Sequence, residues 1–144
     1  MKKMIIAAAM FVSLSAFANE TKVSPKVLNA FNTEFTSAQQ VEWTVTGDYY
    51  KASFDMNGVK VFAFYNMDGD LMCLTRNISS AQLPVHLQAG LKKNYSGYWI
   101  SDLFEVANNN GTTYYATIED GEKKIVLSST NGNDWSTYKK NRKI

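Results

Sequence analysis

The chain is poor in the residues that form disulfides and catalytic pairs. It contains one cysteine, Cys73, and one histidine, His86, among 144 residues. A single cysteine excludes an internal disulfide, so the fold must depend on its apolar core. Cys73 lies in a strand pattern and is predicted to be a small buried hydrophobe. His86 lies off the apolar stripe of its helix and is predicted to face solvent.

The motifs of common hydrolases are missing as well. The sequence has no G-x-S-x-G, no Cys/His pair and no H-E-x-x-H, and His86 has no triad partner at motif spacing. Asn66, Asp68 and Asp70 are spaced like the start of a calcium loop, but Leu71 stands where that loop requires glycine. We therefore predict a protein that is not an enzyme, with no catalytic residue, no cofactor and no metal.

The first eighteen residues have the three parts of a secretory signal. Lys2 and Lys3 form a basic start, residues 4–14 are apolar but too short to anchor in a bilayer, and residues 16–18 read A-F-A. We expect cleavage between Ala18 and Asn19. The mature chain, residues 19–144, would be a single domain in the periplasm or outside the cell, without a transmembrane anchor.

The predicted mature chain has no net charge. Removing Lys2 and Lys3 from the 15 basic residues leaves 13, equal to the 13 acidic ones. A neutral chain argues against nucleic acid as a partner. One basic cluster remains near the C-terminus, and it is either a frayed, solvated tail, which we favour, or a contact to an anionic membrane. It comprises Lys139, Lys140, Arg142 and Lys143.

An antiparallel meander of four strands is predicted over residues 41–76. Its strand patterns are separated by turns at Gly47-Asp48, Asn57-Gly58 and Asp68-Gly69, of which the last two provide the positive φ angles of two-residue hairpins. Counting from these turns puts one apolar set on one face. The predicted pairs are Val45 with Tyr50, Trp43 with Ala52, Val41 with Phe54, Phe54 with Val61, Ala52 with Ala63, and Tyr50 with Tyr65.

Two helices and a second set of strands complete the chain. Ser24 and Pro25 predict a capped helix whose apolar stripe is Val27, Leu28, Phe31 and Phe35. A second helix is predicted after Ser79-Ser80, with Pro84 in its first turn and a stripe of Leu83, Leu87, Leu91 and Tyr95. Strands are expected at 98–107, 112–119, 122–130 and 134–139. A two-residue turn at Asp120-Gly121 would pair Tyr114 with Leu127, Ala116 with Ile125, and Ile118 with Lys123.

The two halves of the chain have the same order of elements. Each is a helix followed by four strands, over residues 24–76 and 79–140, and Tyr50-x-Ala52-x-Phe54 parallels Tyr114-x-Ala116-x-Ile118. Two such repeats joined edge to edge bury both helical stripes on one face. We predict an α+β fold of tandem helix-plus-four-strand repeats, forming one antiparallel sheet of about eight strands with helices on one face.

Four short motifs occur along the chain, in the order Val41-x-Trp43, Tyr50-x-Ala52-x-Phe54, Tyr65-x-x-Asp68-Gly69-x-Leu71 and Leu83-Pro84. The chain resembles the beta-lactamase-inhibitor-like, PepSY-like family of small exported bacterial proteins, over residues 25–138. The resemblance implies an eight-stranded antiparallel sheet with helices on one face and no known catalysis, and it leaves the target open.

The alternate residues of the meander face away from the helices. Aromatic rings mixed with Lys, Ser and Thr are typical of a recognition surface, unless a loop, the tail or a second copy covers Phe62 and Phe64. The expected pairs here are Thr44 with Lys51, Lys51 with Phe64, Ser53 with Phe62, Tyr115 with Val126, and Thr117 with Lys124. The candidate partner-binding residues are Tyr49, Lys51, Phe62, Phe64, Tyr115 and Lys124.

The function that these patterns favour is binding. We expect an exported, non-catalytic protein that recognises a protein or peptide of the cell envelope through the open face of its sheet. The alternative is a carrier or sensor of a small ligand that uses the same face. The two differ in size, because a protein partner needs roughly 800 Å² of surface whereas a small ligand needs a pocket.

Overall fold

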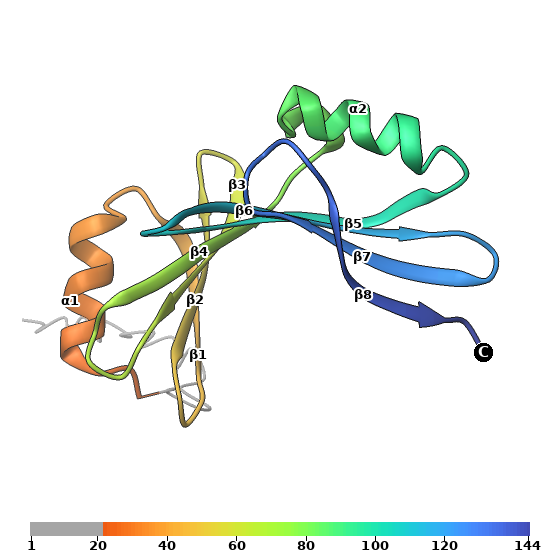
Figure 1. Ribbon diagram of the computed structural model, residues 1–144. Coiled ribbons are helices and arrows are strands. Elements are labelled where there is room, and N and C mark those ends of the chain that lie inside the picture. The colour runs from red at the N-terminus through yellow and green to blue at the C-terminus, as the bar shows by residue number, and fades with distance from the viewer. Residues whose placement is uncertain (1–21) are drawn as a thin grey trace, which may run out of the picture.

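Eight strands form one antiparallel sheet in which every strand lies beside its neighbours in sequence (Figure 1). The computed structural model describes residues 22–144, so the predicted signal peptide and cleavage site lie outside the described residues. The strands are β1 (Gln39–Val45), β2 (Tyr50–Met56), β3 (Val59–Tyr65), β4 (Leu71–Asn77), β5 (Trp99–Asn108), β6 (Gly111–Glu119), β7 (Lys123–Ser129) and β8 (Ser136–Arg142). This confirms the predicted α+β fold.

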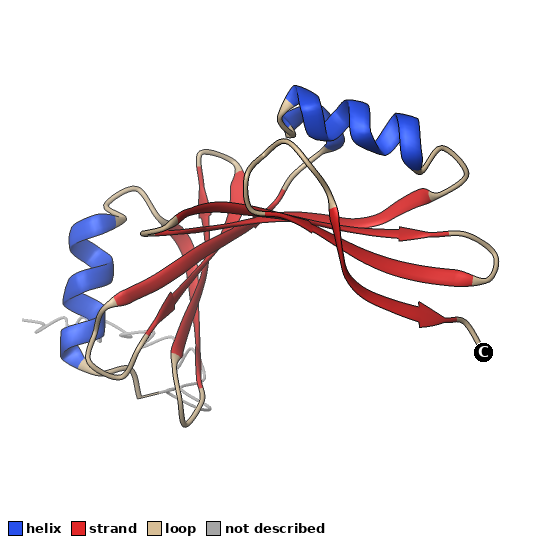
Figure 2. Cartoon of the chain, viewed as in Figure 1, coloured by secondary structure: helices blue, strands red, loops and turns tan. Residues whose placement is uncertain are grey.

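Two helices precede the two sets of four strands, as Figure 2 shows in blue. Helix α1 (Pro25–Glu34) begins where expected, because the Ser24 hydroxyl accepts a hydrogen bond from the Val27 amide at 3.3 Å. Helix α2 (Val85–Asn94) starts later than predicted. Leu83 precedes Pro84 and is extended, as residues before proline prefer to be, so residues 80–82 form a separate 3-10 turn.

The register of the first three strands agrees with the count from the turns, with one correction. Asn57 and Gly58 have φ angles of 53° and 78° and join β2 to β3, so that Phe54 lies opposite Val61. The predicted pairing of Val41 with Phe54 is wrong. Gln40 has a φ of 51° and the β1–β2 ladder shifts between residues 39 and 42, which leaves Val41 37% exposed.

Two turns are longer than predicted. Between β3 and β4 the Asn66 side chain accepts hydrogen bonds from the amides of Asp68 and Asp70, so the turn spans 66–70. The Asp120 carboxylate accepts bonds from the Glu122 and Lys123 amides and widens the β6–β7 loop. The predicted pairing of β6 with β7 is therefore wrong by two residues, although each residue keeps its face because side chains alternate. The observed pairs include Tyr114 with Ser129, Tyr115 with Ser128, Ala116 with Leu127, Thr117 with Val126 and Ile118 with Ile125.

Both helices cover the same face of the sheet, and each has its own core. On α1, Phe31 packs its ring edge-on against Phe54 of β2, with ring centroids 5.0 Å apart. Leu87 of α2 is fully buried in a second cluster that includes Leu103 of β5. The sheet twists strongly between the two cores, so α1 and α2 lie far apart (Figure 1). We call the side of the sheet opposite α1 and α2 the open face.

The basic C-terminus is ordered, which corrects the expectation of a frayed tail. Residues up to Arg142 belong to β8, beside β7. Lys143 continues this contact, because its amide donates to the Glu122 carbonyl at 2.8 Å and its Nζ to the Asp120 carbonyl at 2.8 Å. Its Nζ also lies 2.8 Å from Glu119 Oε2 and 4.7 Å from the centre of the Trp99 ring.

Candidate functional site

The open face carries a first aromatic cluster on β2 and β3. Phe62 and Phe64 alternate with the buried Val61 and Ala63, so they project away from α1. Lys51, directly opposite Phe64, holds its Nζ 4.7 Å from the Phe62 ring centre and 5.8 Å from that of Phe64. This geometry is a double cation–π contact.

Tyr49 completes this cluster from the β1–β2 turn. Its ring centre lies 5.6 Å from that of Phe64. The Thr46 hydroxyl accepts a hydrogen bond from the Tyr49 amide at 3.0 Å, which holds the turn in place. The structure therefore brings together four of the six predicted residues: Tyr49, Lys51, Phe62 and Phe64. All four side chains are half-buried, because they pack against one another although neither α1 nor α2 covers them.

A second aromatic cluster lies on β5, β6 and β8. Phe104 and Tyr115 are cross-strand partners whose rings stack at 5.1 Å with an interplanar angle of 16°. Tyr138 meets Tyr115 edge-on at 5.5 Å and is 67% exposed. Sequence analysis identified Tyr115 and missed the other two. Phe104 follows the buried Leu103, and this alternation could have placed it on the open face.

Small side chains connect the two clusters across the middle of the sheet. Thr75 pairs with Phe62 on one side and with Val106 on the other, and Cys73 pairs with Phe64. Cys73 is half-buried rather than fully buried as predicted. Burial raises the pKa of its thiol, which keeps the sulfur protonated and poorly reactive. The middle of the open face therefore carries small, unreactive side chains between the two aromatic clusters.

Lys124, the sixth candidate, lies apart from both clusters. Its Nζ is 3.4 Å from Glu119 Oε1, in the network that also binds Lys143. Hydrogen bonds from Lys143 and Ser101 lower the pKa of Glu119 to about 2, so this carboxylate stays charged at any ordinary pH. Lys124 is thus engaged in a local ion network, and Lys51 is the cation that lies among the rings.

No family model and no curated protein matches the chain. Solved structures do match it. A BLIP-like protein from Bacteroides fragilis is 17% identical with a TM-score of 0.73, and the match covers 88% of this chain and 90% of that chain. The chain has the BLIP-like fold. This agrees with the resemblance inferred from the motifs.

Two further structures share the BLIP-like fold. A DUF2874 family protein from Bacteroides uniformis is 15% identical, with a TM-score of 0.73 and coverage of 84% of this chain and 90% of that chain. A protein provisionally described as periplasmic, from Bacteroides eggerthii, is 15% identical, with a TM-score of 0.71 and coverage of 84% and 89%. At this identity the likeness establishes the fold alone. Within residues 22–144, no helix is long and apolar enough to cross a bilayer.

Proposed function

We propose that this chain is an exported, non-catalytic binding protein that recognises a protein or peptide of the cell envelope through its open face. The observation that supports this proposal is the pair of aromatic clusters on the face that neither α1 nor α2 covers. Rings with few rotatable bonds, held on paired strands, lose little conformational freedom when a partner covers them.

The arrangement of charge supports the same proposal. Lys51 lies among the half-buried rings of Phe62 and Phe64, and Tyr138 offers an exposed ring and a hydroxyl at the other end of the face. Aromatic anchors around an isolated cation are typical of protein-binding surfaces. The two clusters lie on five strands, β2, β3, β5, β6 and β8, which suits an extended partner better than a compact ligand.

The test is affinity capture from the native envelope with three baits. The first bait is the exported protein, the second carries Phe62→Ser with Phe64→Ser, and the third carries Val85→Ser. Val85 is 76% exposed on α2, so its variant removes apolar surface from the opposite side of the molecule. We expect specific partners with the first and third baits and their loss with the second.

A further variant tests the open face even if the second bait fails to fold. Tyr138→Ser alters the most exposed ring of the open face and should leave the core intact, because Tyr138 is 67% exposed. We expect this folded variant to bind the same partners more weakly. Retention of every partner by both open-face variants, each with a native circular dichroism spectrum, would place recognition elsewhere.

A further inference from the structure

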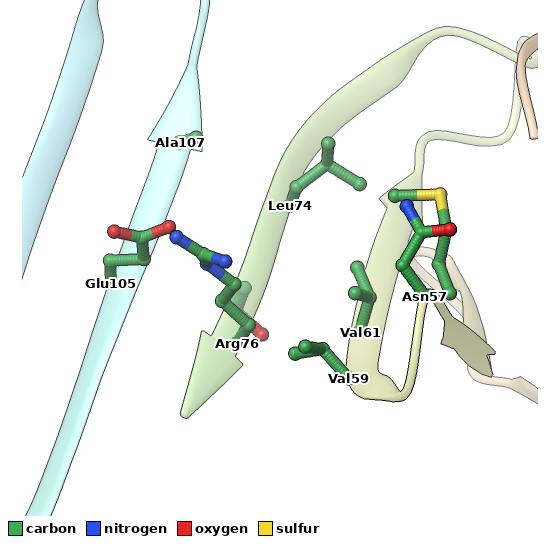
Figure 3. Close-up of a pocket in the computed structure, with 9 residues that line it drawn as sticks. Asn57, Val59, Val61, Leu74, Arg76, Glu105 and Ala107 are labelled. Atoms are coloured by element: carbon green, nitrogen blue, oxygen red, sulfur yellow. The ribbon is translucent and has the colours of Figure 1, made fainter. Parts of the chain in front are cut away.

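A groove lies on the helix side of the sheet, between the two cores. Figure 3 shows side chains that line it. The groove has a volume of about 280 Å³. Its walls come from the end of the β2–β3 hairpin and from the middle strands β4 and β5, where neither helix reaches. The apolar side chains that line it are Met56, Val59, Val61, Leu74 and Ala107.

One ion pair forms the polar part of this groove. Arg76 of β4 and Glu105 of β5 are cross-strand partners, and Arg76 Nε donates to Glu105 Oε1. Within residues 22–144 this is the one hydrogen bond that either side chain makes. The terminal N–H groups of the guanidinium and the second carboxylate oxygen therefore remain available, and the side chains are 40% and 18% exposed.

We propose that this groove binds a free apolar α-amino acid in its zwitterionic form. The ligand carboxylate accepts hydrogen bonds from the terminal nitrogens of Arg76, and its ammonium group donates to the free oxygen of Glu105. The ligand side chain lies against Val59, Val61 and Leu74. At about 30 Å³ for each water-sized group, the groove holds roughly nine non-hydrogen atoms, the size of leucine or methionine.

Charge complementarity selects this ligand class. A plain carboxylic acid would bring a second carboxylate toward Glu105, and a plain amine would bring a second cation toward Arg76. A zwitterion avoids both repulsions and matches a pair of opposite charges. The apolar walls favour an aliphatic side chain over a polar one, because a polar side chain would lose its water without gaining partners.

The site lies on the opposite face from the aromatic clusters. The sequence suggested a small ligand on the open face as an alternative function, whereas the groove is on the helix side. The two proposals are therefore independent, and the Phe62→Ser, Phe64→Ser variant should bind amino acids like the unaltered protein.

The first experiment is calorimetric titration of the purified exported protein with four probes. L-leucine carries all three recognised groups, 4-methylpentanoate lacks the ammonium, 3-methylbutylamine lacks the carboxylate, and glycine lacks the side chain. We expect leucine to bind and each of the others to bind roughly tenfold or more weakly. For 4-methylpentanoate and 3-methylbutylamine this is the loss of a charge-assisted hydrogen bond, and for glycine it is the loss of the buried apolar side chain. Absence of leucine binding, or equal binding of 4-methylpentanoate, would overturn the proposal.

Variants then assign the site. Arg76→Gln and Glu105→Gln should each weaken leucine binding by roughly tenfold or more. The matched control is Asp55→Asn, which breaks the pair of Lys60 and Asp55 at 3.5 Å on the open face and should leave affinity unchanged. Ala107→Leu fills the groove without altering charge, and it should abolish binding. Unchanged affinity in the folded Arg76, Glu105 and Ala107 variants would show that leucine binds elsewhere.

Discussion

The indole N–H of Trp135 donates a 2.9 Å hydrogen bond to the backbone carbonyl of Leu87. This bond connects the loop before β8 with the first turn of α2, 48 residues earlier in the chain. Gly90, one turn further along the helix, allows the contact, since a Cβ there would lie 3.2 Å from Trp135 Cδ1. The side chain of Trp135 thus links the start of β8 to α2.

Trp135→Phe should therefore destabilise the protein. The variant keeps an aromatic ring but loses the hydrogen bond, so we expect the free energy of unfolding to fall by about 1–2 kcal/mol. Chemical denaturation followed by circular dichroism measures it. Trp99→Phe is the control, because Trp99 is 53% exposed, and its effect should stay within about 0.5 kcal/mol. Equal losses in both variants would contradict the role given to Trp135.

A second pair of variants tests the bulge in β1. Trp43 lies opposite Ala52 and packs edge-on against Phe31 with ring centroids 5.2 Å apart. Trp43→Ala should cost about 3 kcal/mol, at the low end for core aromatics because the ring is half-buried. Val41→Ala should cost less than about 0.5 kcal/mol, since the bulge exposes Val41. A regular register would bury Val41, so a loss above about 1 kcal/mol would argue against the bulge.

Tyr65→Phe should stabilise the fold. The Tyr65 ring is buried in the α1 core, and its hydroxyl has no hydrogen-bond partner among the described residues. Removing an unsatisfied buried hydroxyl should add about 1 kcal/mol to the free energy of unfolding. Tyr50→Phe is the matched control on the neighbouring strand, where little change is expected. A loss of stability in Tyr65→Phe would reveal a partner for the hydroxyl.

The same tyrosine should affect stability at high pH. Burial, with the charge of Glu34 nearby, raises the pKa of Tyr65 to about 12. Its folded pKa lies above its unfolded value of about 10, so its stabilising contribution is complete below pH 10. That contribution is lost as the pH rises toward 12. Melting temperatures measured between pH 9 and pH 12 should fall less steeply in Tyr65→Phe than in the unaltered protein.

Acid should weaken the contact between the C-terminus and the β6–β7 loop. Hydrogen bonds from Lys143 and Ser101 lower the pKa of Glu119 to about 2, below its unfolded value of about 4.3. The stabilising contribution is therefore present above about pH 4.3 and is lost as the pH falls toward 2. Glu119→Gln should flatten the fall in melting temperature over this window. Glu42→Gln, on the exposed surface of β1, should leave the profile unchanged.

Local signals were enough to predict most of the fold. The cap at Ser24, the Asn57-Gly58 turn and the alternation in β2 and β3 act over a few residues, and each agrees with the structure. The errors came from features that alternation does not encode. A bulge at Gln40 and a widened loop at Asp120 each depend on local hydrogen bonding or backbone angles that a count from the nearest turn ignores.

The candidate site was predictable only within each half. Tyr49, Lys51, Phe62 and Phe64 belong to consecutive strands, so their meeting follows from two hairpins. Phe104 and Tyr138 reach Tyr115 from β5 and β8. Predicting their contacts would have required the register of both strands and the register shift in β8. The Arg76–Glu105 pair was missed for the same reason, since it spans the junction of the two halves.

The junction between β4 and β5 also determines which parts of the protein can open independently. The ladder there runs only from Leu74 to Asn77, and neither helix bridges it, so each core is stabilised within its own half. Amide hydrogen exchange should then resolve two protected units with separate opening free energies. Trp135 links the loop before β8 to α2 within the second unit. When that unit opens, its amide protons would exchange while the amides covered by α1 stay protected.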